Sequence, residues 1–284
     1  MLISTILFSF TFAILSLNGV TASGNIHWVV TTENKDQLLS TQDAILSFSG
    51  ISDLPTAPLN IVLSPDIKYQ TMFGFGSSLE SSTCYNMNLL DPKARDALMK
   101  SLFSTSDGIG FNLMRLTIGT SDYCSPPYYS YNDRPAGRAD PNLEYFNTVW
   151  DEPYVVPVIQ EALIKSRAFV ANDPNAAKDE LLLFASPWSG PSWMKSSGQL
   201  IGGELLDEYM PQYAQYLSKF VTAYSSLYEI NIYAITAQNE PNHLSSIYPS
   251  SFLTPEKEAE LIANHLGPEM NRLGVKIWGY DDNW

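Results

Sequence analysis

A glutamate follows a buried hydrophobic run in the last fifth of the chain. Residues 230–237 are typical of a buried strand, and Gln238-Asn239-Glu240-Pro241 comes directly after them. A carboxylic acid at a strand tip can exchange a proton with a substrate, and the proline that follows favours an extended backbone, which would aim the side chain. The amide of Asn239 offers a donor and an acceptor to a substrate hydroxyl. Glu240 is alternatively a solvated loop residue, but its position favours catalysis.

Two tryptophans follow another predicted strand, at 180–185. Residues 186–195 read Ser-Pro-Trp-Ser-Gly-Pro-Ser-Trp-Met-Lys, so that Trp188 and Trp193 lie among prolines. A stiff aromatic wall of this kind suits the C–H face of a sugar ring. Tryptophan is also a common core residue, but two of them with polar neighbours at a strand end favour a binding role.

Arg115 lies inside a predicted apolar strand at 112–118. A charge there is costly unless a carboxylate pairs with it. In a barrel the side chain would point inward, where it could stabilise an anionic nucleophile or form a structural ion pair with another acid; both interpretations stay open. Asp122, just beyond the strand end, is placed to accept hydrogen bonds from sugar hydroxyls.

The elements that must position these residues alternate between strands and helices. Apolar strands separated by amphipathic helices indicate an α/β protein with a parallel sheet, which can be doubly wound or closed into a barrel. No Gly-x-Gly-x-x-Gly opens a helix after a strand, so a dinucleotide-binding sheet lacks support. The glycines of Gly74-Phe75-Gly76 favour close backbone approach instead. We expect strands at 67–72, 112–118, 180–185, 230–237 and 275–280, a further β-type run at 59–63, and helices at 91–103, 156–169, 206–224 and from Thr254, with Gly267-Pro268 ending or kinking the last.

Charge and composition exclude some classes of function. The 284 residues carry 16 basic and 30 acidic side chains, and the formal net charge of −14 argues against binding to nucleic acid or to an anionic membrane. The three histidines are scattered, and no metal-binding spacing is present. We therefore expect no metal site.

The first 22 residues differ from the rest of the chain. An apolar run at 6–17 precedes Val20-Thr21-Ala22, a small-x-small cleavage site, although no Lys or Arg comes before the run. This predicts a signal peptide rather than an uncleaved anchor, because the run is shorter than the ~20 residues of a membrane span. Cys84 and Cys124 fit an oxidising compartment, either as one disulfide or as two thiols.

The sequence resembles glycoside hydrolase family 30, and within it the glucosylceramidases. The similarity runs from about residue 70 to residue 284. Asn-Glu-Pro is shared with other barrel glycosidases, whereas Ser-Pro-Trp-x-x-Pro-x-Trp-Met-Lys is much more specific. The similar stretches are Phe73-Gly74-Phe75-Gly76, residues 108–112 with Arg115, residues 186–195, Ala237-Gln238-Asn239-Glu240-Pro241, Leu253-Thr254-Pro255-Glu256 and Leu266-Gly267-Pro268.

The resemblance implies a (β/α)8 TIM barrel with a β-sandwich side domain built from both chain ends. Residues 23–68 would be the N-terminal strands of the side domain, and residues 69–284 a partial barrel truncated after about strand five. Asn239 and Glu240 match the family's acid/base pair at the tip of strand four. Trp188 and Asp122 match residues that hold the nonreducing sugar, and Arg115 matches the arginine near the nucleophile.

The implied activity is retaining hydrolysis of a β-glucosidic bond, foremost in glucosylceramide, without metal or organic cofactor. Retention needs a second carboxylate ~5–5.5 Å from the first; in the family it lies at strand seven, which would fall beyond residue 284, so we expect these 284 residues alone to be inactive. The alternatives are a secreted endo-β-1,6-glucanase of the same family and an inactive sugar-binding fragment. The expected location is the secretory pathway, lysosomal or extracellular, with contact to a membrane surface only through a lipid substrate.

Overall fold

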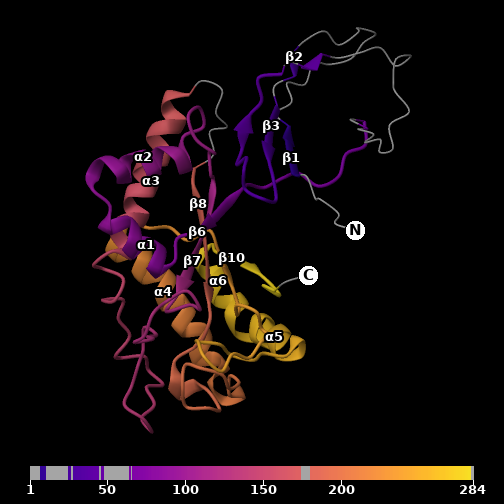
Figure 1. Ribbon diagram of the computed structural model, residues 1–284. Helices are drawn as coiled ribbons and strands as arrows, with labels where there is room; N and C mark the ends of the chain where they lie inside the picture. Colours follow the sequence, from indigo (N-terminus) through magenta and orange to yellow (C-terminus); the bar gives the residue numbers. More distant parts are fainter. Residues whose placement is uncertain are drawn as a thin grey trace. The chain divides into compact units, whose positions relative to one another are not determined.

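The computed structural model describes residues 7–10, 25–26, 28–44, 46–47, 64, 66–173 and 180–282 (Figure 1). The chain divides into two compact units, Met1–Gln70 and Thr71–Trp284. This division lies close to the predicted boundary between residues 68 and 69. The assignment of the first unit to a side domain stays a prediction.

The first unit contains short antiparallel strands. Strands β1 (Leu7–Phe10), β3 (Trp28–Thr31) and β4 (Ser40–Thr41) form one sheet in the order β1-β3-β4, and β2 (Asn25–Ile26) pairs with β5 (Leu46–Ser47). Strand β1 falls within the predicted signal peptide, most of which lies outside the described residues, as does the β-type run predicted at 59–63. The signal peptide therefore stays a prediction.

The second unit is built on one five-stranded parallel sheet. Its strands are β6 (Gly76–Ser78), β7 (Leu113–Ile118), β8 (Leu182–Pro187), β9 (Ala234–Thr236) and β10 (Lys276–Trp278). Neighbours in the sheet are neighbours in the sequence, and each pair is parallel. A doubly wound sheet would reverse its strand order at the binding crevice. The sequential order is that of a partial (β/α)8 barrel, as predicted.

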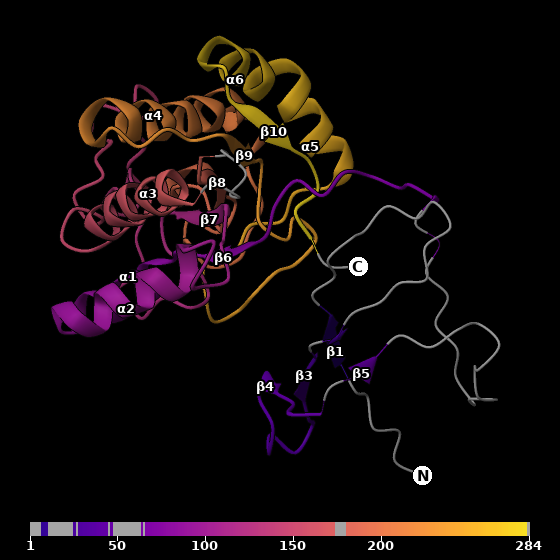
Figure 2. The ribbon, with the colours of Figure 1, turned by 90° about the horizontal axis from the view of Figure 1, so that it is seen from above.

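The helices lie along the outer side of this sheet. Viewed from above, the strands form an inner arc and the helices an outer arc in nearly the same sequence order (Figure 2). The helices are α1 (Ser81–Leu89), α2 (Pro92–Phe103), α3 (Val155–Asn172), α4 (Met210–Tyr228), α5 (Pro255–Leu261) and α6 (Gly267–Leu273). Short 3₁₀ turns, η2 (Ser192–Met194) and η3 (Asp207–Tyr209), precede α4.

Local sequence signals explain where several helices begin. The Asp91 side chain accepts hydrogen bonds from the backbone of Lys93 and Ala94 at 2.9 and 3.0 Å, which caps α2. Thr254 caps α5 in the same way. Gly267-Pro268 does not end the last helix, because a π-helical segment, η4 (Ile262–Leu266), joins α5 directly to α6. Pro268 is the second residue of α6, which directly follows this π-helical segment.

Three features of the second unit differ from the sequence prediction. The first strand lies at Gly76–Ser78, whereas residues 67–72 have no regular structure, so the strand predicted there was wrong. A Cβ at Gly76 would lie 1.3 Å from the carbonyl oxygen of Leu113, so only glycine allows this pairing. Strand β9 is also shorter than predicted, and helix α1 was not predicted.

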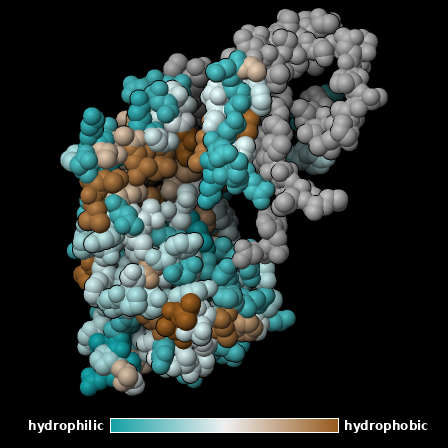
Figure 3. Space-filling model, in the orientation of Figure 1, coloured by the Kyte–Doolittle hydropathy of each residue, from teal (hydrophilic) through white to brown (hydrophobic). Residues whose placement is uncertain are grey.

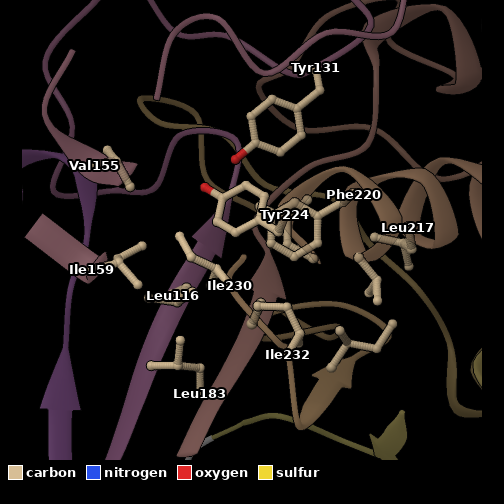
Figure 4. Close-up of a cluster of buried hydrophobic side chains, with 14 of the residues drawn as sticks. Leu116, Tyr131, Val155, Ile159, Leu183, Leu217, Phe220, Tyr224, Ile230 and Ile232 are labelled. Carbon is tan, nitrogen blue, oxygen red and sulfur yellow. The ribbon is translucent and has the colours of Figure 1, made fainter. Parts of the chain in front are cut away.

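The core of the second unit lies between the sheet and the helices. Figure 4 shows side chains from β7, β8 and α4, with Leu116, Leu183 and Phe220 among them, gathered in one cluster, and all three are at most 1% exposed. The rings of Tyr131 and Phe220 are stacked, with centroids 5.8 Å apart. On the face drawn in Figure 3, hydrophobic side chains lie in separate patches among hydrophilic ones. This core fixes the strands whose ends carry the candidate site.

Candidate active site

The predicted site residues follow successive strands of one parallel sheet. The carboxyl ends of parallel strands meet at a single edge, which is where barrel enzymes build their active sites. The structure therefore places the polar side chains on the same edge. They are Asp122 after β7, Trp188 after β8, Asn239 and Glu240 after β9, and Asp281 after β10.

Arg115 on β7 brings several of these residues together. Its Nη2 donates to Asn239 Oδ1 at 2.7 Å and to Asp281 Oδ2 at 2.6 Å. Its guanidinium carbon lies 4.5 Å from the centre of the Trp188 ring, within the range of a cation–π interaction. The structural ion pair, one of the two interpretations left open for Arg115, is thus present, and its partner is Asp281.

Asp281 is also bonded to two neighbouring strands. Its Oδ2 accepts hydrogen bonds from Ser186 Oγ at 2.7 Å and from Thr236 Oγ1 at 3.1 Å, in addition to the one from Arg115. One carboxylate oxygen therefore joins β7, β8 and β9. The sequence analysis did not identify this role of Asp281. The lone arginine in an apolar strand was the signal that an acid must lie opposite.

The backbone of Glu240 differs from the expectation. The following proline predicted an extended conformation, but the observed φ of Glu240 is +44°. The Glu240 amide donates to the carbonyl of Asp281 at 2.7 Å, and the His243 amide donates to the carbonyl of Glu240 at 2.8 Å. These bonds hold the residue in a left-handed turn that costs about 1–3 kcal/mol, a strain typical of functional positions.

Trp188 is more enclosed than the predicted aromatic wall requires. Only 4% of the residue is exposed, and Arg115 lies over its ring. Its carbonyl accepts a hydrogen bond from Gln238 Nε2 at 2.8 Å, which ties it to the segment that carries Glu240. Trp193 instead packs edge-on against Tyr209 and donates to Asn132. Trp188 therefore packs its ring face against the guanidinium of Arg115. Trp193 packs against Tyr209.

Tyr248 is a site residue that the sequence analysis missed. Burial raises its pKa, and the negative charges of Glu240 and Asp122 raise it further, so both acids lie in the neighbourhood of Tyr248. The Tyr248 hydroxyl is 2.9 Å from His243 Nε2. Asp122 is itself exposed. No sequence signal marked Tyr248, because it lies in a loop without periodicity.

Glu80 is a second acid that sequence reasoning missed. It follows β6, is 8% exposed, and accepts hydrogen bonds from Ser121 Oγ at 2.5 Å and Ser78 Oγ at 3.1 Å. Ser121 directly precedes Asp122, so Glu80 anchors the loop that presents Asp122. An acid just after the first strand was the available signal, but that strand had been placed too early in the sequence.

The cysteines and the remaining acids suggest no further chemistry at this edge. Neither Cys84 nor Cys124 is in a disulfide, and both are buried. Burial, with a contribution from the Asp151 carboxylate, raises the pKa of Cys84 to about 12, which keeps it as an unreactive thiol. Within the described ranges, no three His, Cys, Asp or Glu side chains gather as a metal site would need. Nor does any described helix have the length and hydropathy to cross a bilayer.

Comparison with known proteins identifies the relatives of this chain. The family model described as the glycosyl hydrolase family 30 TIM-barrel domain matches residues 72–283. An endo-1,6-β-D-glucanase of Aspergillus fumigatus is 36% identical over 231 residues, which cover 75% of this chain and 44% of the relative. The lysosomal acid glucosylceramidase of Mus musculus is 33% identical over 235 residues, covering 79% of this chain and 42% of the relative.

A solved structure agrees with these sequence matches. An endo-β1,6-glucanase superposes with a TM-score of 0.70 at 28% identity, covering 92% of this chain and 53% of that protein. The chain spans about half the length of the curated relatives it matches.

Proposed function

Because this chain belongs to glycosyl hydrolase family 30, we propose that the whole protein is a retaining β-glycosidase that cleaves β-1,6-linked glucan. Glu240 is the acid/base of this reaction. The observation that carries the proposal is the position of Asn239 and Glu240 at the carboxyl edge of the sheet. Asn239 bonds to Arg115, which pairs with Asp281, and the Glu240 amide bonds to the Asp281 carbonyl. Barrel glycosidases present their carboxylates at this edge.

In the proposed reaction Glu240 first protonates the bridging oxygen of the glycosidic bond. It then accepts a proton from the water that releases the glycosyl-enzyme. No residue described at this edge is assigned as the nucleophile that forms this intermediate. Asn239 Oδ1 accepts a hydrogen bond from Arg115. The side-chain nitrogen of Asn239 is therefore the group that donates a hydrogen bond to a sugar hydroxyl. Trp188 holds the guanidinium of Arg115 in place.

Arg115 also has a donor that the described residues do not use. Its Nε is buried, and no acceptor for it exists among the described residues. An unpaired buried donor on a charged group is costly, so a partner is expected. This supports a role for Arg115 beside the anionic nucleophile of the whole protein, in addition to its ion pair with Asp281.

The choice of β-1,6-glucan over glucosylceramide rests on the relatives. Likeness to the fungal endo-1,6-β-glucanase and to the solved endo-β1,6-glucanase supports glucan as the substrate. The proposal of β-1,6-glucan replaces the prediction from the sequence alone, which favoured glucosylceramide. The glucosylceramidase reading stays as a second candidate because the mouse enzyme is similar over nearly the same share of this chain. A glucan substrate goes with an extracellular location, which the predicted signal peptide supports.

The test incubates the whole protein separately with a soluble β-1,6-glucan and with glucosylceramide in detergent micelles. We expect short β-1,6-linked oligosaccharides, whose newly formed reducing ends have the β configuration when first released. Release of ceramide without glucan cleavage would establish the second candidate and reject the first. Binding of both without any cleavage would leave only the inactive sugar-binding alternative.

A further inference from the structure

A cavity of about 490 Å³ lies beside the loop that carries Asp122, among residues that the candidate active site does not use. It is bounded by helix α1, the loop 120–127 and the segment that precedes α3. Its volume is in the range of ordinary ligand pockets, about 300–1,000 Å³. Its lining residues are Ser81, Ser82, Tyr85, Asn86, Thr120, Cys124, Ser125, Pro126, Pro127, Tyr129, Trp150 and Tyr154.

The chemistry of this lining points to a neutral polyhydroxylated ligand. None of the lining side chains is a Lys, Arg, Asp or Glu, so the cavity offers no charge for a phosphate or a carboxylate. The hydroxyls of Ser81, Ser82, Thr120 and Tyr129 already bond within the protein. The amide of Asn86 and the hydroxyls of Tyr85, Ser125 and Tyr154 supply donors and acceptors to a ligand, and aromatic rings supply flat apolar faces. Rings beside hydroxyls and amides are the combination that a pyranose needs, because its C–H face stacks while its hydroxyls form hydrogen bonds.

Two aromatic rings are exposed in the cavity. Trp150 is 50% exposed and Tyr85 is 51% exposed, although both are large apolar side chains. One face of Trp150 is stacked on Tyr129, with ring centroids 5.5 Å apart and planes 19° apart. The opposite face of the Trp150 ring is therefore the one left for a ligand. Tyr85 packs edge-on against Tyr154 at 5.5 Å, which fixes its orientation.

The stacked rings of Trp150 and Tyr129 are held in place by a buried carboxylate. Tyr129 is 7% exposed, and its hydroxyl donates to Asp151 Oδ1 at 2.7 Å. Asp151, 1% exposed, also accepts from the hydroxyls of Tyr131 and Tyr224 at 2.5 and 2.6 Å. Trp150 thus rests on a ring that cannot move without breaking a charged hydrogen bond. A preorganised aromatic surface binds with less loss of conformational entropy than a mobile one.

We propose that this cavity is a second carbohydrate-binding site, which holds a pyranose unit of a neutral glucan chain against Trp150 and Tyr85. Because the loop between Thr120 and Cys124 also carries Asp122, a chain bound here lies beside the candidate active site. Arg115, Asn239 and Glu240 of the candidate active site do not line this cavity. It would bind glycan whether or not the whole protein hydrolyses it.

The test measures retardation of the whole protein in native gels that contain a soluble β-1,6-glucan. We expect Trp150→Ala and Tyr85→Ala each to weaken the apparent affinity about five- to tenfold. Tyr145→Ala removes a 53% exposed aromatic ring outside the cavity and serves as the matched control, which should bind like wild type. Thermal unfolding of each variant shows whether it is folded, and Tyr85→Ala decides the outcome if Trp150→Ala is not.

The same gels separate this site from the candidate active site. In an Asn239→Ala background, retardation should persist, and adding Trp150→Ala should still weaken it about five- to tenfold. Because the cavity is uncharged, binding should change less than twofold between 50 and 500 mM salt. Wild-type affinity in both Trp150→Ala and Tyr85→Ala would overturn the proposal. So would complete loss of retardation in Asn239→Ala alone, since binding would then depend on the active site.

Discussion

The guanidinium of Arg115, in strand β7, and the carboxylate of Asp281, just after strand β10, form an ion pair at 2.6 Å. The two residues are 166 positions apart in the sequence. Both side chains are only partly exposed, 22% for Arg115 and 24% for Asp281. The pair positions Asn239 and covers Trp188, so the geometry around Glu240 depends on it.

Removing this pair should destabilise the fold measurably. We predict a coupling energy of about 1–3 kcal/mol from a double-mutant cycle of Arg115→Ala and Asp281→Ala, because partly buried charged hydrogen bonds contribute more than exposed ones. The measurement is the free energy of urea unfolding of the four proteins. The surface pair Arg272–Glu269, at a similar 2.7 Å but with Arg272 62% exposed, is the matched control. It should give about 0.5 kcal/mol or less; equal coupling in the two pairs would contradict this account.

Removing a tyrosine hydroxyl that bonds to the buried carboxylate of Asp151 should lower the free energy of unfolding strongly. Tyr224→Phe removes a hydroxyl that donates to Asp151 Oδ2 at 2.6 Å from a residue 1% exposed. We predict a loss of about 1.5–3 kcal/mol, typical of a hydrogen bond to a charged group. Tyr228→Phe is the control, because its hydroxyl is less buried and bonds to Thr148 at 2.7 Å and to Glu152 at 3.0 Å. Chemical denaturation should rank Tyr224→Phe as clearly the more damaging change, and a reversed order would refute the prediction.

Lys195 should make the free energy of unfolding change with pH between about pH 7 and pH 10. It is 3% exposed and donates to Ser189 Oγ and to the carbonyls of Leu200 and Ser250 at 2.6–2.7 Å. Burial lowers the pKa of Lys195 from 10.5 to about 7. Between these two values the unfolded chain holds the proton and the folded protein does not, so raising the pH favours folding.

We therefore predict that the unfolding free energy of wild type, minus that of Lys195→Met, increases from pH 7 to pH 10. The increase is at most about 1.4 kcal/mol per pH unit. Urea unfolding of both proteins at several pH values measures it, and other titrating groups cancel in the difference. Lys93→Met, at an exposed position in α2, controls for the loss of one positive charge. A difference that stays flat or decreases with pH would disprove the assignment.

Much of the barrel could be predicted because its signals are local. Periodicity located β7 and β8 within two residues, and Asp91-Pro92 and Thr254-Pro255 marked the starts of two helices. Parallel topology then placed the ends of those strands at one edge. The positions of Arg115, Trp188 and Glu240 relative to one another followed from that edge.

What escaped prediction depends on contacts between distant segments. The strand at Gly76 carries too few apolar residues for a periodic signal, and it exists because Leu113 can approach its backbone. The left-handed turn at Glu240 is held by Asp281 and overrides the preference set by Pro241. Tyr248 and Glu80 join the site through loops, whose paths no periodicity describes. Each of these needs a partner that is remote in sequence.

The central claim is that Glu240 protonates the leaving oxygen and then activates water. In the whole protein, Glu240→Ala should lower the hydrolysis of a β-glucoside with a good leaving group by slowing only the second step, because such a leaving group needs little protonation. Azide needs no general base, so it should restore turnover and give a β-glucosyl azide. Glu260→Ala, at an exposed position in the same unit, should show neither effect. Wild-type turnover in Glu240→Ala, or a lost activity that azide does not rescue, would contradict the account.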